Sequence, residues 1–136
     1  MFSKPAYGWS RVEIGEFCGE ASYLTDVPFD ILSALIAHFE YNIATGVLFD
    51  EEGSDFVFMV DKCKSYILSD RDELRIYEIH KDDYEIAEEI INDIEEYIDG
   101  WAGWLSYDHD ICVESRKTEI QKLINELRNV TKGALK

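Results

Sequence analysis

The sequence predicts an α+β domain: a mainly antiparallel sheet of about six strands packed with three helices, in the order ββαββββαα. Short apolar segments separated by tight turns predict the strands, and three longer segments with a helical period of apolar residues predict the helices. The chain has 136 residues, 46% of them hydrophobic, which suits one domain with its own core. We expect residues 1–136 to form a single domain, with loosely ordered ends at residues 1–8 and 132–136.

The first third of the chain predicts two strands and a helix. Residues 11–24 alternate apolar and polar side chains, which is typical of two short strands, and Gly19 is the expected turn or bulge between them. Thr25 and Asp26 are residue types that cap a helix N-terminus. We expect this helix to end around Tyr41-Asn42.

The middle of the chain predicts four consecutive strands. Residues 44–49 and 55–60 flank an acidic, glycine-containing turn and form the clearest hairpin signal in the chain. Residues 64–69 and 74–79 are expected to add two more strands. The run Phe56–Val60 is apolar at every position, which predicts a central strand covered on both faces.

Two helices are expected in the last third, at residues 82–99, where Gly100 can end the helix, and at residues 111–130. At about 100° per residue, the isoleucines of the first of these helices fall on one side. The opposite side carries eight residues, seven of them acidic: Glu85, Glu88, Glu89, Asn92, Asp93, Glu95, Glu96 and Asp99.

The charge balance narrows the classes of partner. The chain has 29 acidic and 13 basic residues, a net charge of −16, and 12 of the acids lie between Glu78 and Asp110. An acidic surface is repelled by phosphate and by anionic lipid, so we expect no nucleic-acid or membrane partner. The acidic helix face has two interpretations, a solvated surface or a docking surface for a basic protein. Trp104 follows this face, either as core packing or as an anchor for the partner.

The sequence contains no recognisable catalytic, cofactor or metal motif. His38, His80 and His109 are far apart, and Cys63 with His80 is a weak candidate for a nucleophile and its base. We therefore predict no catalytic residues, no cofactor, no metal and no enzyme activity. The three cysteines form no CxxC pair, and we expect them to be buried thiols of a cytoplasmic protein. No segment is long and apolar enough for a membrane span or a signal peptide.

One resemblance adds to this interpretation. The runs Tyr7–Phe17 and Ser22–Pro28, together with the acidic helix ending at Gly100-Trp101, resemble small bacterial immunity proteins of contact-dependent growth inhibition and polymorphic toxin systems. The resemblance implies a cytoplasmic protein without an active site of its own, which binds one cognate toxin domain and blocks it. Toxins of this kind are often basic nucleases.

The leading hypothesis is therefore an immunity protein that neutralises a basic toxin by stoichiometric occlusion. The expected partner-binding residues are Glu85, Glu88, Glu89, Asp93, Glu96, Asp99 and Trp104. The main alternative is an acidic interaction module or adaptor that binds a non-toxic basic partner, or a homodimer. An enzyme with an unrecognised carboxylate site is the remaining alternative.

Overall fold

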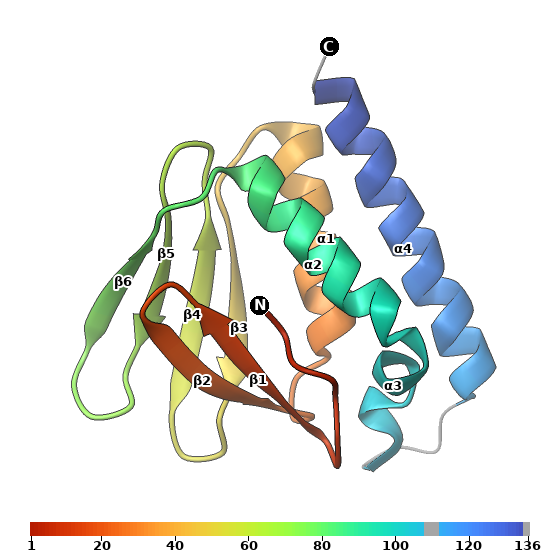
Figure 1. Cartoon of the computed structure of the whole chain (residues 1–136), viewed down its shortest axis with the longest axis horizontal. Helices are drawn as coiled ribbons and strands as arrows, with labels where there is room; N and C mark the ends of the chain where they lie inside the picture. Colours follow the sequence, from red (N-terminus) through yellow and green to blue (C-terminus); the bar gives the residue numbers. More distant parts are fainter. Residues whose placement is uncertain (108–111, 135–136) are drawn as a thin grey trace.

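The computed structural model describes residues 1–107 and 112–134, and it confirms the α+β class and the ββαββββ order that precedes the helical C-terminal third. The elements, in chain order, are β1 (Trp9–Ile14), β2 (Phe17–Ser22), α1 (Val27–Tyr41), β3 (Thr45–Asp50), β4 (Asp55–Val60), β5 (Ser65–Ser69), β6 (Arg75–Ile79), α2 (Asp83–Glu96), α3 (Ile98–Ala102), the 3-10 helix η1 (Trp104–Tyr107) and α4 (Val113–Ala134). The helices lie together on one side of the strands (Figure 1).

The six strands form two antiparallel sheets. A two-stranded sheet pairs β1 with β2, and a four-stranded sheet has the order β3-β4-β5-β6. The hairpin of β1 and β2 packs on the core side of the larger sheet, where the Phe17 ring lies 4.8 Å from the Phe56 ring. Two small sheets allow the hairpin to cover one end of the core while the helices cover the rest (Figure 1).

The core side of the larger sheet is strongly buried. Seven apolar side chains that face the helices and the hairpin are at most 5% exposed: Val47, Phe49, Phe56, Phe58, Val60, Ile67 and Ile79. They alternate with outward-facing residues, as the period of two residues in a strand requires.

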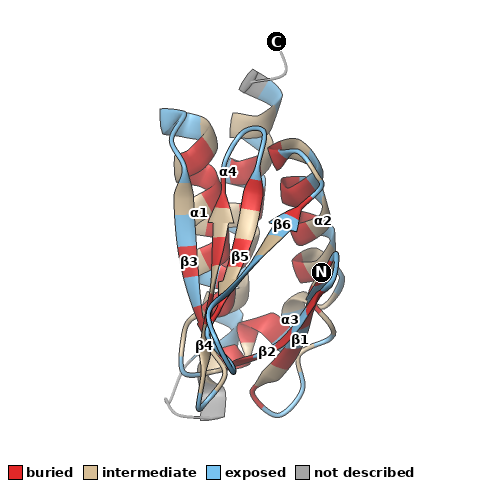
Figure 2. Ribbon diagram, turned by 90° about the vertical axis from the view of Figure 1, so that its left-hand side faces the viewer, coloured by how far each residue is buried: buried red, intermediate tan, exposed pale blue. Residues whose placement is uncertain are grey.

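Strand β4 is central, as expected, but the prediction that it is covered on both faces is wrong. Phe56 and Phe58 are buried, whereas Val57 and Met59 on the other face are only partly buried. The apolar side chains on this second face of β4 are not covered by any described element of the chain. In Figure 2 the larger sheet lies in front of the helices, with exposed and intermediate residues along its strands.

The turn between the first two strands lies at Gly15, with a φ of 57°, and not at Gly19 as expected. Gly19 pairs with Val12 inside the hairpin. The lack of a side chain at Gly19 leaves room for the Phe17 ring, because a Cβ there would lie 2.7 Å from that ring.

The expectation of loosely ordered ends is wrong for the N-terminal segment. Phe2 is only 6% exposed, and its ring lies 5.6 Å from the Trp101 ring. The main-chain nitrogen of Ser3 donates a hydrogen bond to the Arg11 carbonyl. At the other end, α4 runs to Ala134, and the last two residues lie outside the described residues.

The expected helix over residues 82–99 is divided into two. Asp82 caps α2, because its side chain accepts a hydrogen bond from the Glu85 amide. The helix ends at Glu96, and Tyr97, with φ −118° and ψ 37°, joins it to α3. Trp101, in α3 after the break, is fully buried. Residue 111, the expected start of the last helix, lies outside the described residues.

Candidate protein-binding surfaces

The acidic side of α2 is oriented by the apolar side of the same helix. Ile86, Ile90 and Ile94 are fully buried in the core, so the carboxylates at the intervening positions point away from it. The structure therefore produces the amphipathic helix that the sequence predicts. The carboxylates on it have different environments, and these decide which of them are available to a partner.

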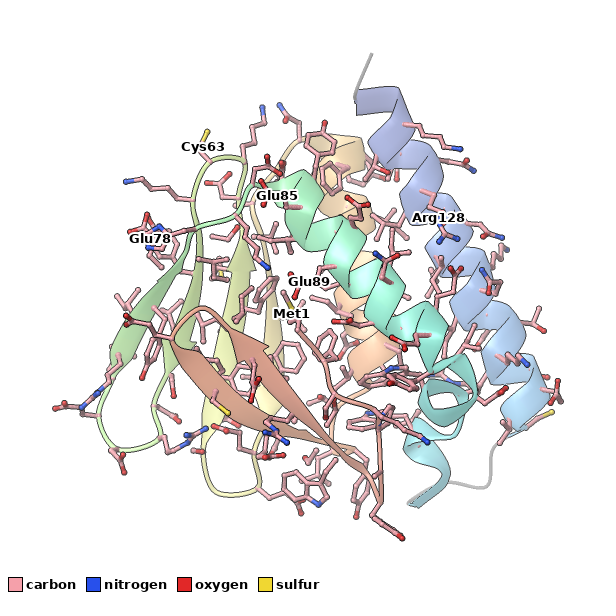
Figure 3. The ribbon with its side chains drawn as sticks, viewed as in Figure 1. Met1, Cys63, Glu78, Glu85, Glu89 and Arg128 are labelled. Atoms are coloured by element: carbon pink, nitrogen blue, oxygen red, sulfur yellow. The ribbon has the colours of Figure 1, made fainter. Side chains whose placement is uncertain are left out.

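Glu89 and Asp93 bind the start of the chain. The terminal nitrogen of Met1 lies 2.8 Å from a carboxylate oxygen of each, and the Phe2 amide donates to Asp93 at 3.0 Å. Figure 3 shows Met1 beside Glu89. Burial opposes ionisation of Glu89, but hydrogen bonds from Lys81 and the terminal ammonium outweigh it and lower the pKa of this carboxyl. These two carboxylates have a structural role.

Two further carboxylates of this region pair with α4. Arg128 donates to both carboxylate oxygens of Glu95, at 2.7 and 2.8 Å, and the hydrogen bond from Arg128 is the main reason that the pKa of Glu95 is lowered. Lys117 lies 2.9 Å from Asp99 on α3. The ion pairs link α2 and α3 to α4, and they reduce the negative charge that this surface presents.

Fewer of the predicted carboxylates are therefore available to a partner than the sequence indicated. Glu85, Glu88 and Glu96 have no ion pair with any described residue, whereas Glu89, Asp93 and Asp99 are each paired within the molecule. We keep these three unpaired residues as candidate partner contacts. The sequence could not show the pairing, because the cations come from residues distant in the chain.

Trp104 is not available as an anchor. It is 2% exposed, its ring lies 5.1 Å from the Trp101 ring, and its indole N–H donates to the Thr25 carbonyl at 2.8 Å. The prediction of a partner contact at Trp104 is wrong, and core packing is its role. The hydrogen bond satisfies the indole nitrogen inside the core.

A buried polar pair joins the end of α1 to the start of α2. His38 is 2% exposed, with Nδ1 2.5 Å from the Ile43 carbonyl oxygen and Nε2 2.8 Å from a carboxylate oxygen of Asp83. Both partners are acceptors when Asp83 is ionised, so both ring nitrogens then donate. Sequence reasoning missed this pair, because residues 38 and 83 are brought together only by the fold.

The larger sheet has a second surface that sequence reasoning missed. We define its outer face as the side of β3–β6 opposite the core. Four aliphatic residues that are paired in register cross this face, one from each strand: Leu48, Val57, Leu68 and Ile76. We call them the aliphatic row. Its ends are the most exposed members, with Leu48 49% and Ile76 64% exposed.

Three acidic residues lie beside the aliphatic row. Asp50 pairs with Asp55 across β3 and β4, and the Asp55 amide donates to the Asp70 side chain at 2.8 Å. We call these three residues the carboxylate row. None of them has an ion pair with a described residue. Partial desolvation and the neighbouring carboxylates Asp50, Asp70 and Glu51 raise the pKa of Asp55.

The basic residue nearest to the carboxylate row in sequence does not pair with it. Arg71 follows Asp70 directly, but its guanidinium binds Glu51 and the Cys18 carbonyl. Lys62 and Lys64 lie in the turn between β4 and β5, at the opposite end of these strands. The carboxylate row thus keeps its negative charge next to an apolar surface.

The described residues contain no group of three or more potential metal ligands, and none of their helices is both long and apolar enough to cross a bilayer. All three cysteines are exposed, so the prediction that they are buried is wrong. Cys63 lies in the exposed turn after β4, and Cys18 faces away from the core in β2. Comparison with family models, curated proteins and solved structures finds no match for this chain.

Proposed function

We propose that this chain is an immunity protein that binds one basic toxin domain in a one-to-one complex and blocks it. The observation that carries the proposal is the distribution of charge. Arg71, Lys81, Arg116, Lys117 and Arg128 all form ion pairs within the molecule. These five basic residues are therefore already paired with carboxylates of the same chain. The carboxylates that stay unpaired make the surface negatively charged.

Among the described carboxylates without an ion pair, two groups stand close together: Glu85, Glu88 and Glu96 on α2, and the carboxylate row on the outer face of the sheet. A field of this sign accelerates association with a basic protein by one to three decades, and the carboxylates accept hydrogen bonds from Lys and Arg in the complex. The resemblance to immunity proteins supports a toxin as that basic protein, and a cytoplasmic site of action.

The test is capture followed by a toxicity assay. The purified chain is immobilised, a lysate of the source organism is passed over it at low salt, and bound protein is eluted with a salt step and identified. The captured protein is then expressed in a bacterial host with and without this chain. We expect a basic protein that arrests growth alone and is neutralised by co-expression.

A captured basic protein that does not arrest growth would overturn the immunity proposal and favour the adaptor alternative. Turnover of a substrate by the purified chain, abolished by one carboxylate substitution that leaves the fold intact, would favour the enzyme alternative. Each outcome is read from a different measurement, so the three functions are separable.

A further inference from the structure

We infer that the outer face of the four-stranded sheet is a docking surface for a basic polypeptide whose contact region combines apolar side chains with Lys or Arg. The inference goes beyond the proposed function in placing the contact away from α2, and it rests on that function only for the basic character of the partner.

The outer face of the sheet departs from the pattern of a solvated sheet. An antiparallel sheet with one face in water alternates apolar residues toward the core with polar residues toward solvent. Here the outward positions in the middle of the strands are apolar. Val57, Met59 and Leu68 lie on the opposite side from the core, and none of them belongs to the core cluster or packs against it.

The apolar surface on this face is continuous from strand to strand. The aliphatic row crosses all four strands, a span of about 14 Å at the usual spacing of neighbouring strands. Met59 covers Gly46 in the adjacent row, where a Cβ would lie 2.7 Å from the Met59 sulfur. Leu74, 70% exposed just before β6, borders the same face. Contiguous exposed apolar surface of this kind marks interaction sites.

The negative charge beside the aliphatic row indicates that the partner of this face is basic. The carboxylate row lies two residues along the strands from the aliphatic row, about 7 Å away. Partial desolvation and mutual repulsion of the carboxylates raise the pKa of Asp55, so cations supplied by a partner would relieve an unfavourable arrangement. A second copy of the chain would bring another net charge of −16, which opposes self-association.

The partner surface must therefore place a Lys or Arg about 7 Å from its apolar contacts. An amphipathic peptide has this chemistry and serves as a defined probe. We would use a 14-residue peptide of leucine and lysine with the leucines at helical spacing, and measure its binding to the intact chain by calorimetry. Peptides with serine in place of leucine, or glutamate in place of lysine, are the ligand controls.

Two pairs of matched variants locate the site on the protein. Leu48→Ser/Ile76→Ser is compared with Leu24→Ser/Ile43→Ser, since Leu24 and Ile43 are 50% and 49% exposed at positions outside the strands. We expect the first variant to weaken binding about tenfold or more, from two lost apolar contacts, and the second to bind as the parent does. Thermal unfolding of each variant checks that its fold is intact.

The second pair holds net charge constant. Asp50→Asn/Asp55→Asn/Asp70→Asn and Glu85→Gln/Glu88→Gln/Glu96→Gln remove the same charge, so long-range attraction falls equally in both. We expect the aspartate variant to bind about tenfold more weakly than the glutamate variant, from the loss of three surface ion pairs. Equal binding by the two triple variants would overturn the inference.

Further outcomes separate this inference from the proposed function. A parent chain that is dimeric by light scattering, and becomes monomeric on Leu48→Ser/Ile76→Ser, would assign the face to a second copy and overturn the inference. Neutralisation of a captured toxin that is unaffected by these substitutions would also overturn it, and would leave the immunity proposal standing. Peptide binding with the expected variant pattern, but a non-toxic partner, would overturn the immunity proposal alone.

Discussion

The carboxylates of α2 differ in role, and exchanging two pairs of them for amides measures the difference. In Glu89→Gln/Asp93→Asn, the partly buried terminal nitrogen of Met1 loses both of its anionic partners. Breaking a fully buried pair costs about 3–5 kcal/mol and an exposed pair less than about 1 kcal/mol. The Glu89 and Asp93 side chains are 28% and 22% exposed, so we expect a loss of about 2 kcal/mol between these limits.

Glu85→Gln/Glu88→Gln removes the same charge from the same helix and is the matched control. These residues have no ion pair with a described residue, and removing them relieves like-charge repulsion of a few tenths of a kcal/mol. We expect its free energy of unfolding to stay within about 0.5 kcal/mol of the parent. Urea unfolding followed by the fluorescence of the buried tryptophans gives both values. Equal stability of the two double variants would refute the structural role of Glu89 and Asp93.

Three further predictions concern the rest of the molecule. His38→Ala leaves the buried Asp83 carboxyl without its hydrogen bond to the imidazole, and should cost about 2 kcal/mol; a loss below about 1 kcal/mol in urea unfolding would contradict this. The lowered pKa of Glu95 means that its contribution to stability is present above the carboxyl's ordinary pKa and is lost as pH falls through the lowered value. Arg128→Gln should therefore destabilise the chain at neutral pH and progressively less as the pH falls through that lowered pKa, and a loss that is the same at every pH would argue against the pair. The pKa of Cys112 is lowered by hydrogen bonds from a neighbouring serine, so this thiol should react with a disulfide reagent faster than the other two exposed cysteines, as peptide mapping of the labelled chain would show.

Local pattern was sufficient to predict most of the fold. The alternation in the strands, the acidic cap at Asp82 and the isoleucine stripe of α2 each depend on residues near one another in sequence, and each was confirmed. The break at Tyr97 and the turn at Gly15 were missed. Residues distant in sequence pack at both places, since Trp101 lies against the Phe2 ring and a Cβ at Gly19 would lie 3.1 Å from the Glu51 carboxylate.

The candidate surfaces were harder to predict than the fold. Composition correctly identified an acidic helix face, but only the folded chain shows that Met1 and Arg128 neutralise part of it. The outer face of the sheet left a signal in the sequence, because Phe56–Val60 is apolar at every position. That signal was interpreted as coverage by the chain itself. The described residues cover only one side of this strand, and we propose that a partner covers the other.

The claim that the outer face of the sheet binds the partner is tested most directly with two variants, each of which replaces one exposed leucine by serine. Their binding to the captured basic partner is compared. Association is measured for Leu48→Ser, on the outer face, and for Leu24→Ser, outside the sheet, both at low salt. We expect weaker binding and weaker neutralisation by Leu48→Ser, with Leu24→Ser equal to the parent. Parent-like binding by both variants, with both folds intact, would contradict the claim and return the contact to the unpaired glutamates of α2.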